Sequence, residues 1–565
     1  MTTAQSGGHG DEWRLGTEPG EPHQRPPSAQ PHEPAPDLSL SRLERPLQVV
    51  TVEHLGWFLI GLWAAVTRLV LIGARPLGAA EARNALFEFD LANKTSSAAA
   101  AGFHPAWGGW VHLLEAGIFA VAGAGDLTAR VIFVLSGLLL VAMAFEMRHY
   151  VGRAGGLALG AMLTVSPTAT YFGRASATVM PAAAFALATI AVFMALKSQP
   201  RRRRALGLGA VAGLMIAADP AGVITVSGFA AALGILGVWE LIIGNNRYLR
   251  IRVWMDRYLS LVIAAIVAAV AITGLSFGVL PGIFERIKTL AWLNGMGKPD
   301  YLRGLEFYLP GLALYEFLIL ILGAAAAVLV VAARIRSRLA VWCLAWTVAS
   351  FGAYLWIPLR APDFTLALIL PSAILGAFAV DYAHHANAWR YIRYVIAALM
   401  LLTVYVQLIA TFVYFAPDAS EAPWRRHASL YWRDGAATIQ LAERSAEILK
   451  LVSPADATVA FIGAGGPAPA LHWYLRALRP TASADSATVV VNVDPVASTA
   501  TGADHGFEFD FEESWQPRIE ALDAARTLRY LFAARVWGPV TTRSAVITVR
   551  PAGASAPTII LTPGE

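Results

Sequence analysis

The stretch WGGWVHLLEAGIFAVAG, residues 107–123, decides how this 565-residue chain is threaded. It is apolar and close to the roughly 17–25 residues that a helix needs to cross a bilayer core, yet it carries His112 and Glu115. It either crosses the membrane or lies along its surface. Every loop that follows changes sides with that choice, so the charges of those loops can decide between the two readings.

The composition indicates a membrane protein. Hydrophobic residues make up 56% of the chain, charged residues 15%, and the mean hydropathy is +0.53, which is more apolar than soluble proteins of this length. Besides 107–123, apolar runs of membrane-spanning length recur along the chain. They lie at 55–73, 127–147, 155–172, 178–197, 205–218, 221–243, 258–280, 309–333, 339–357, 364–381 and 391–415. These runs predict an all-α polytopic membrane domain of about 11 transmembrane helices.

The arginines favour the surface position for 107–123. With a cytoplasmic N-terminus and 107–123 on the surface, every cytoplasmic loop is basic, including RRRR at 201–204 and the arginines between 334 and 338. If 107–123 crossed, these clusters would move outside, against the positive-inside rule. Trp107 and Trp110 also suit an interfacial helix. The prediction is a multi-pass protein of the cell membrane with a cytoplasmic N-terminus, a juxtamembrane helix and an extracytoplasmic C-terminus.

Composition divides the chain into three parts. Residues 1–46 are rich in Gly, Pro, Glu and Gln and predict a disordered cytoplasmic segment. Residues 47–415 form the transmembrane domain, with a long outer loop at 74–126. Residues 416–565 predict a small extracytoplasmic α/β domain, since short apolar strands and helical periods alternate there. The predicted strands are 457–463, 487–493 and 544–549, and the predicted helices are 436–452 and 516–536.

Charge and cysteine content exclude some classes of protein. The net charge is only +5 and the arginines lie between apolar runs, which indicates membrane topology and no nucleic-acid partner. Cys343 is the one cysteine, so no disulfide forms within the chain. An ion-coupled transporter fits less well, because few charges lie inside the predicted spans and no inverted repeat is visible.

Polar residues gather in the segments predicted to face outside. These segments are the loop 74–126, the turn 171–177, the loop 281–308, the short 358–363 and the turn 217–222. Taken singly, each charged residue in them reads as an interfacial anchor. Taken together they predict a site on the outer face, with candidates Glu81, Arg83, His104, Arg174, Arg360 and Asp363.

The order of short motifs resembles the GT-C superfamily of membrane glycosyltransferases, which includes protein mannosyltransferases and the aminoarabinose transferase of lipid A. The first span and loop read TRLVLIGARPLGAAEARNA, followed by HP at 104–105, GDLTARVIFVLSGLLLVAM and SPTATYFGRAS. A prokaryotic subgroup is most similar, with the motifs RPLHHDE, HP, YFSR, KxPW and WYLR. Here LRAPDF places Arg360 at the lysine of KxPW, and HWYLR at 472–476 matches the last motif.

The resemblance implies a reaction and roles for the candidate residues. A sugar would move, with inversion, from a polyprenyl-phosphate donor in the membrane lipids to a lipid, glycan or protein acceptor outside. Glu81 would be the catalytic base, and Arg174 and Arg360 would contact the phosphate. The remaining substrate-binding positions would be Arg83, His104 and Asp363. A divalent metal ion, Mg²⁺ or Mn²⁺, is the cofactor that such chemistry admits.

The chain departs from the motif at three places. Ala80 stands where the relatives carry the aspartate of the DE pair, YFGR is followed by no acidic residue, and Asp219-Pro220 replaces a lysine-containing turn. Glu88, Asp90 or Asp219 are alternative sources of a carboxylate. Two hypotheses follow. The protein is a glycosyltransferase, or it is a catalytically degenerate membrane scaffold or lipid-carrier-binding subunit that retains the fold.

Overall fold

A computed structural model describes most of the membrane domain and parts of the C-terminal region. The described residues are 51–94, 108–242, 248–274, 312–356, 364–386, 389–413, 435–452, 457–462, 468–481, 486–493, 507–515, 525 and 540–549. The predicted disordered segment 1–46 lies outside them, as does the predicted helix 516–536 apart from Ala525.

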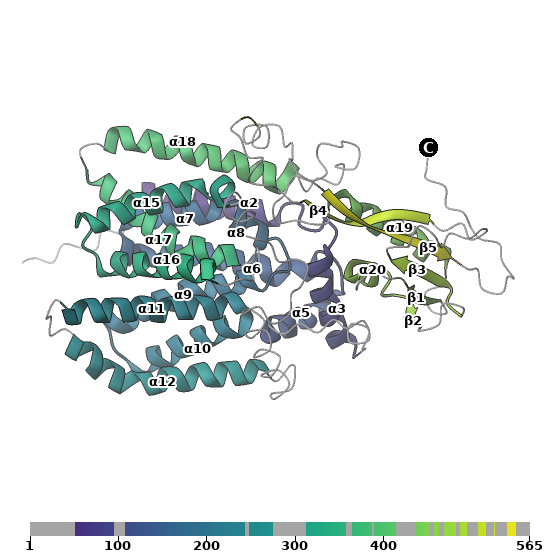
Figure 1. Cartoon of the computed structure of the whole chain (residues 1–565), viewed down its shortest axis with the longest axis horizontal. Coiled ribbons are helices and arrows are strands. Elements are labelled where there is room, and N and C mark those ends of the chain that lie inside the picture. Colours follow the sequence, from purple (N-terminus) through teal and green to yellow (C-terminus); the bar gives the residue numbers. More distant parts are fainter. Residues whose placement is uncertain are drawn as a thin grey trace, which may run out of the picture. The chain divides into compact units, whose positions relative to one another are not determined.

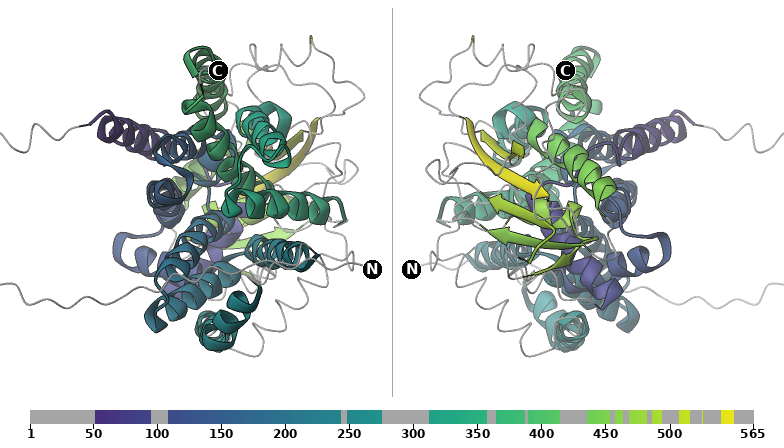
Figure 2. Two further views of the ribbon diagram at one scale, coloured as in Figure 1. Left: turned by 90° about the vertical axis from the view of Figure 1, so that its left-hand side faces the viewer. Right: turned by 90° about the vertical axis from the view of Figure 1, so that its right-hand side faces the viewer.

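Each of the eleven predicted apolar runs contains a helix. These helices are α2 (Val52–Leu69), α6 (Val131–Val151), α7 (Arg153–Val165) with α8 (Pro167–Phe172), α9 (Val179–Ser198), α10 (Arg202–Ala218), α11 (Pro220–Ile242), α12 (Tyr248–Gly274), α15 (Phe317–Val331), α16 (Arg338–Trp356), α17 (Phe364–His384) and α18 (Trp389–Leu408), which continues as a π-helix at Ile409–Val413. Figure 1 shows α10, α11 and α12 side by side, and Figure 2 views much of the bundle along its helices.

The helices present apolar side chains both to one another and outward. Within the described residues, five helical segments are long and apolar enough to cross a membrane, and several further apolar helices are shorter. Large apolar side chains such as Phe58 (64% exposed), Val267 (60%) and Leu401 (70%) lie on the outer surface of the bundle. A soluble surface does not carry so many large exposed apolar groups, whereas lipid tails accept them. The chain is therefore a membrane protein; its orientation in the membrane stays a prediction.

Helix α17 forms the centre of the bundle. Every residue from Phe364 to Val380 is buried, and the helix packs against α7, α15 and α16. Small residues allow the close approach to α15, because a Cβ added at Gly376 would lie 3.0 Å from the Leu322 Cβ. Close backbone approach of this kind is typical of helix packing in membranes. Helix α17 is thereby the buried element against which α7, α15 and α16 pack.

The third predicted run is broken into α7 and α8 at Ser166-Pro167, which the apolar pattern did not indicate. Pro167 begins α8, and the Ser166 hydroxyl accepts a hydrogen bond from the Ala169 amide as an N-cap. The same hydroxyl donates to the buried Glu316 carboxylate over 2.7 Å. Gln407 of α18 donates over 2.7 Å to the Thr164 carbonyl, which the break leaves without a helical partner. Polar side chains thus satisfy the break, and α8 leads directly into the turn that carries Arg174.

The long first loop folds into helices. It contains α3 (Ala79–Asn93), α5 (Gly109–Ala122) and the 3₁₀-turn η2 (Thr128–Arg130) that precedes α6. The predicted juxtamembrane helix corresponds to α5, which packs against α3 and α10, and Trp110 Nε1 donates to the Leu214 carbonyl over 3.1 Å. Gly108, with φ +85°, allows the chain to turn into α5 beside this contact. A helix at 109–122 is confirmed; its position along the membrane surface stays a prediction.

The C-terminal region contains a mixed sheet. Strands β2 (Arg479–Pro480), β1 (Thr458–Ile462), β3 (Val489–Val493), β5 (Val540–Val549) and β4 (Phe507–Trp515) lie side by side in that order. β1 pairs in parallel with β2 and β3, and β5 is antiparallel to β3 and β4. Helix α19 (Gly435–Leu451) packs against β4 of this sheet and contacts the short helix α20 (Pro469–Tyr474) (Figure 2, right). The three predicted strands and the helix 436–452 are confirmed. The sequence did not predict β2 and β4. β2 has only two residues and is too short to show a period, and β4 is rich in acidic residues and does not form an apolar run.

Candidate functional site: a buried carboxylate among arginines

One side of α3 faces the other outer segments. Glu81, Asn84 and Glu88 recur at the three- and four-residue spacing that places side chains on the same side of a helix. Asn84 Nδ2 donates to the Ser176 carbonyl over 3.1 Å, and the Ser176 amide donates to Glu81 Oε1 over 3.0 Å. Two hydrogen bonds therefore join helix α3 to the backbone of the turn after α8. These hydrogen bonds bring the first loop and the turn 171–177 together in the folded chain.

The Glu81 carboxylate receives five N–H donors. Arg130 binds it in a bidentate manner, with Nε 2.9 Å from Oε1 and Nη2 2.9 Å from Oε2. Arg75 Nη2 lies 2.6 Å from Oε2, and the Gly78 amide donates to the same oxygen over 3.2 Å. The Ser176 amide is the fifth donor. Only 6% of Glu81 is exposed, so its charge is balanced by protein groups and not by water.

These donors decide the protonation state of Glu81. Burial by itself raises the pKa of the carboxyl, but the charges of Arg130 and Arg75 and the hydrogen bonds from Arg130 and the Ser176 amide lower it to about 2. A carboxylate in this state stays ionised and has its lone pairs occupied, which is the arrangement of a structural anchor. The role of Glu81 as a general base stays a prediction, and this geometry weighs against it, because a base needs an open lone pair directed at the acceptor.

Two more buried arginines lie beside this ion cluster. Arg174 Nη1 donates to the Thr67 carbonyl over 2.7 Å, and Arg68 Nη2 donates to the Leu163 carbonyl over 3.1 Å. Arg68 Nε is buried and meets no acceptor among the described residues. A Cβ added at Gly173 would lie 3.2 Å from Arg68 Nε, so the glycine makes room for this guanidinium. We call Arg68, Arg75, Arg130 and Arg174 the arginine cluster.

Among the described residues, the arginine cluster has more positive than negative charge around it. Burial, and then the charges of Arg75, Arg130 and Arg68, lower the pKa of Arg174 to about 9. Within the part of the chain that the structure describes, Glu81 contacts the cluster directly and Asp126 acts on Arg130 from nearby, so four cations lie beside two carboxylates. Buried charge that is not balanced is costly, and a bound anion would relieve that cost. The cluster therefore has the chemistry of an anion site.

The alternative carboxylates are also buried near this face. Glu88 Oε1 lies 2.8 Å from His112 Nδ1, and burial raises the pKa of Glu88 well above its ordinary range. Burial and the charge of Glu88 raise the pKa of Glu115 to about 9. Asp219 accepts from the Thr178 hydroxyl over 2.5 Å and from the Ala221 amide over 2.8 Å, so it caps the start of α11. Asp90 is buried as well.

The structure brings only some of the predicted site residues together. Glu81 and Arg174 lie at the same cluster, whereas Arg83 lies on the exposed side of α3. His104, Arg360 and Asp363 lie outside the described residues. Sequence reasoning did not single out the other three arginines of the cluster. Their signals were an arginine inside a predicted span (Arg68) and the motifs ARPLG and GDLTAR (Arg75 and Arg130).

The described residues do not fit a metal ion. Within the described part of the chain, no three His, Cys, Asp or Glu side chains gather closely enough to hold one. Glu81 is the acidic side chain in contact with the arginine cluster, and N–H donors occupy its oxygens. We therefore derive no step through a metal ion from these residues.

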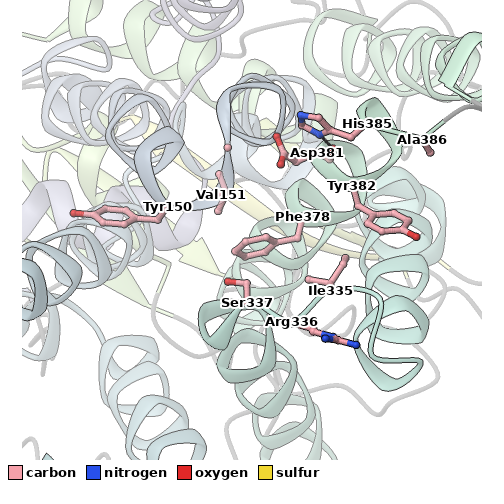
Figure 3. A pocket seen from close by; sticks show the side chains of 11 residues that line it. Tyr150, Val151, Ile335, Arg336, Ser337, Phe378, Asp381, Tyr382, His385 and Ala386 are labelled. Atoms are coloured by element: carbon pink, nitrogen blue, oxygen red, sulfur yellow. Dashed lines mark hydrogen bonds between the residues drawn. The ribbon is translucent and has the colours of Figure 1, made fainter. Parts of the chain in front are cut away.

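A cavity of about 460 Å³ lies elsewhere in the bundle (Figure 3). Its lining includes Tyr150 at the end of α6 opposite to Arg130, and at about 1.5 Å per helical residue the two ends are roughly 30 Å apart. Asp381 also lines the cavity, and the Gly155 amide at the start of α7 donates to it over 3.4 Å. This cavity is separate from the arginine cluster.

Comparison with known proteins shows the fold. No family model and no curated protein sequence matches the chain. Among solved structures, ArnT from Cupriavidus metallidurans in the apo state matches with 14% identity and a TM-score of 0.54, covering 78% of this chain and 93% of ArnT. ArnT bound to undecaprenyl phosphate matches with the same identity and TM-score, covering 87% of this chain and 98% of that one. An Archaeoglobus fulgidus oligosaccharyltransferase in complex with Zn and sulfate matches with 14% identity and a TM-score of 0.45, covering 77% and 67%.

The class of protein that the fold defines is therefore a membrane protein with the fold of the GT-C glycosyltransferases. This confirms the predicted fold class of an all-α membrane domain with a small C-terminal α/β region. The similarity to ArnT, at 14% identity, speaks for the fold alone.

Proposed function

We propose that this chain binds the phosphate of a polyprenyl-phosphate-linked sugar at the arginine cluster and transfers the sugar to a lipid, glycan or protein acceptor outside the membrane. The observation that carries the proposal is the excess of buried positive charge that the described residues place around Glu81. Arg68 adds an N–H group that meets no acceptor among these residues. Guanidinium groups suit phosphate oxygens because they offer several donors in a fixed plane.

The shared fold supports a lipid-linked phosphate as the ligand. The ArnT structure that covers most of this chain contains undecaprenyl phosphate. In this chain the arginine cluster lies where the first loop and the turn after α8 meet, at the ends of apolar helices. A ligand with an apolar chain and an anionic head matches both surroundings. We further propose the predicted orientation, with this end of the bundle facing outside and the parts 47–415 and 416–565 acting as membrane and extracytoplasmic domains.

The proposed reaction is an inverting displacement. An acceptor oxygen attacks the anomeric carbon, the bond from that carbon to the phosphate oxygen breaks, and the electron pair leaves with the phosphate. The acceptor proton passes to a base. The arginine cluster stabilises the negative charge that grows on the departing phosphate. Glu81 keeps two proposed roles, the base that the resemblance implies and the anchor of Arg75 and Arg130, and its five donors favour the anchor.

A second candidate function follows from the same contacts. Ala80 lacks the carboxylate that the related motif carries, and the oxygens of Glu81 are already hydrogen-bonded. A protein with these features binds the lipid carrier without transferring its sugar. This is the lipid-carrier-binding scaffold of the two sequence hypotheses.

Binding and transfer measured on the same variants separate these functions. We expect the full-length protein in lipid nanodiscs to bind undecaprenyl phosphate, and R174A to weaken that binding by about tenfold or more, the typical effect of losing a charge-assisted hydrogen bond. R153A is the matched control, because Arg153 begins α7, just past the end of α6 that lies away from Arg130, and its side chain is exposed. Equal binding by R174A and the parent protein would remove the arginine cluster as the site.

Glu81→Gln distinguishes the two roles of Glu81. If Glu81 is a base, E81Q abolishes sugar transfer while undecaprenyl phosphate still binds. If Glu81 is an anchor, E81Q weakens binding as well, because Arg75 and Arg130 lose the charge that orients them. Transfer that is absent from the parent protein, together with specific carrier binding, supports the scaffold.

A further inference from the structure

We propose that Tyr474 is a positioning residue for the arginine cluster, through a clamp formed by Trp473, Tyr474 and Arg476 of the C-terminal region on the first outer loop. We call these three residues the tail clamp. The proposal deepens the proposed function and rests on it for the identity of the ligand. The clamp itself consists of contacts that involve no ligand.

The Tyr474 hydroxyl joins two parts of the first loop. It accepts a hydrogen bond from the Leu77 amide over 2.7 Å and donates one to Asp126 Oδ2 over 2.8 Å. Leu77 lies between Arg75, which binds Glu81, and Gly78, whose amide donates to Glu81. A contact at Leu77 therefore acts on the backbone that presents Arg75 to the arginine cluster.

Asp126 connects the tail clamp to the segment just before α6, which also contains Arg130, the residue that binds Glu81. Its other oxygen, Oδ1, accepts from Trp473 Nε1 over 2.9 Å. Four residues further on, the Arg130 guanidinium donates to the carbonyls of Ile72, Arg75 and Pro76 over 2.8, 2.6 and 3.0 Å. Residues 72–78 are thus held by Arg130 and by Tyr474, and both of these are anchored just before α6.

Apolar packing supports these polar contacts. Leu77 and Trp473 are both fully buried, at 0% exposure, in one hydrophobic cluster with Phe119. Arg476 stacks on the Trp473 ring at 3.7 Å and donates to the Ala124 carbonyl over 2.9 Å. The loop and the helix α20 therefore share a core, so displacing the tail clamp exposes apolar side chains of the loop.

The Tyr474 hydroxyl suits this role because it stays protonated. Burial and the neighbouring Asp126 raise the pKa of Tyr474 well above its ordinary range. The hydroxyl can then accept from Leu77 and donate to Asp126 at the same time. Without it, the Leu77 amide and a carboxylate oxygen of Asp126 each lose a hydrogen-bond partner. A buried polar group left without its partner costs more free energy than removing both partners would.

The test uses full-length Y474F in lipid nanodiscs, with Y391F as the matched control, since Tyr391 is an exposed tyrosine on α18. Hydrogen exchange of peptides covering 72–86 measures the loop, and binding of undecaprenyl phosphate measures the site. For Y474F we expect faster exchange in 72–86 and about tenfold weaker binding, with neither effect in Y391F. The variant D126A provides a second route, and the double variant should lose no more than D126A alone, because D126A already removes the partner of the Tyr474 hydroxyl.

The outcomes separate this inference from the proposed function. Unchanged exchange of 72–86 in both Y474F and D126A overturns the clamp. Faster exchange with unchanged binding overturns the positioning role. If the parent protein binds no undecaprenyl phosphate but Y474F still loosens 72–86, the proposed function fails while the contact between tail and loop is upheld. A fall in binding that Y391F shares counts against Tyr474 as well.

Discussion

At the scale of single residues, the chemistry of the site depends on the hydrogen-bond donors that surround the Glu81 carboxylate. Glu81 accepts from two arginines and two backbone amides, and each of these comes from a different point of the outer segments. The same residue in an open loop would be an ordinary surface acid. Arg174 shows the opposite imbalance, since burial and three neighbouring cations disfavour its charge. The pair predicts two different responses to pH.

Glu81 should give the folded protein an acid-sensitive stability. The pKa of Glu81 falls from 4.5 to about 2 on folding, which corresponds to about 3 kcal/mol. Because the pKa of Glu81 is lower in the folded protein, its ionised carboxylate stabilises the folded state at every pH above the unfolded-state pKa. This stabilisation is lost as the pH falls from about 4.5 to about 2, where the folded protein also takes up the proton. Thermal unfolding in detergent across this range should show the slope in the parent protein. E81Q should lack it, and an equal slope in E81Q would assign the acid sensitivity to other groups.

Arg174 should make ligand binding sensitive to alkali. Because its pKa is about 9, Arg174 carries its charge below that pH and loses it above, where it no longer attracts an anion. The affinity of the protein for undecaprenyl phosphate should therefore fall as pH rises past about 9. Titration of R174A should give a flat profile over the same range. A profile for R174A with the same inflection would show that another group titrates.

At the scale of elements, the site depends on how closely backbones approach. The turn after α8 lies against α3 through Ser176 and beside Arg68 through Gly173. Both contacts require that α8 begins at Ser166-Pro167, where Glu316 satisfies the broken backbone. A helix that continued without this break would carry the turn to a different place.

Gly173→Ala should loosen the arginine cluster. An added Cβ would lie 2.9 Å from the Ala169 carbonyl oxygen and 3.2 Å from Arg68 Nε, so backbone or guanidinium must shift. We expect about 1–3 kcal/mol of destabilisation and weaker carrier binding. Gly207 is the matched control, because a Cβ there meets nothing within 4 Å and alanine favours the helix. Measured unfolding in which G173A behaves like G207A would contradict the close packing of Arg68.

At the scale of the whole molecule, apolar helices form the bulk of the fold and the polar contacts gather at one end of α6. Arg130 begins that helix and Tyr150 lies near its other end, beside the cavity of Figure 3. The exposed apolar side chains on α2, α12 and α18 are the surfaces that lipid would cover. The positive-inside rule predicts that the end of α6 beside Arg130 faces outside.

Single cysteines can establish the orientation. The native Cys343 is buried, so a thiol introduced elsewhere is the one that reacts. We expect K450C to react with a membrane-impermeant maleimide on intact cells, and R153C to react only after the membrane is opened. Lys450 and Arg153 both have exposed side chains. Labelling in the reverse order would invert the predicted topology and place the arginine cluster on the cytoplasmic side.

The sequence by itself determined the helices, three strands of the sheet and the membrane class, because the length and period of apolar runs are local properties. It did not show the break at Ser166 or the short β2, where few residues carry the signal. It also singled out Glu81 and Arg174, since charges at the ends of apolar runs are conspicuous.

Only the tertiary structure decided what these residues contact. Glu81 meets Arg130 from 49 positions away and Ser176 from 95, and Tyr474 reaches Leu77 across 397 positions. Such partners are chosen by how buried helices pack, which no local period encodes. The sequence led to a lone glutamate that suggested a base, whereas the packing surrounds it with five N–H donors, which supports its proposed role as the anchor of the arginine cluster.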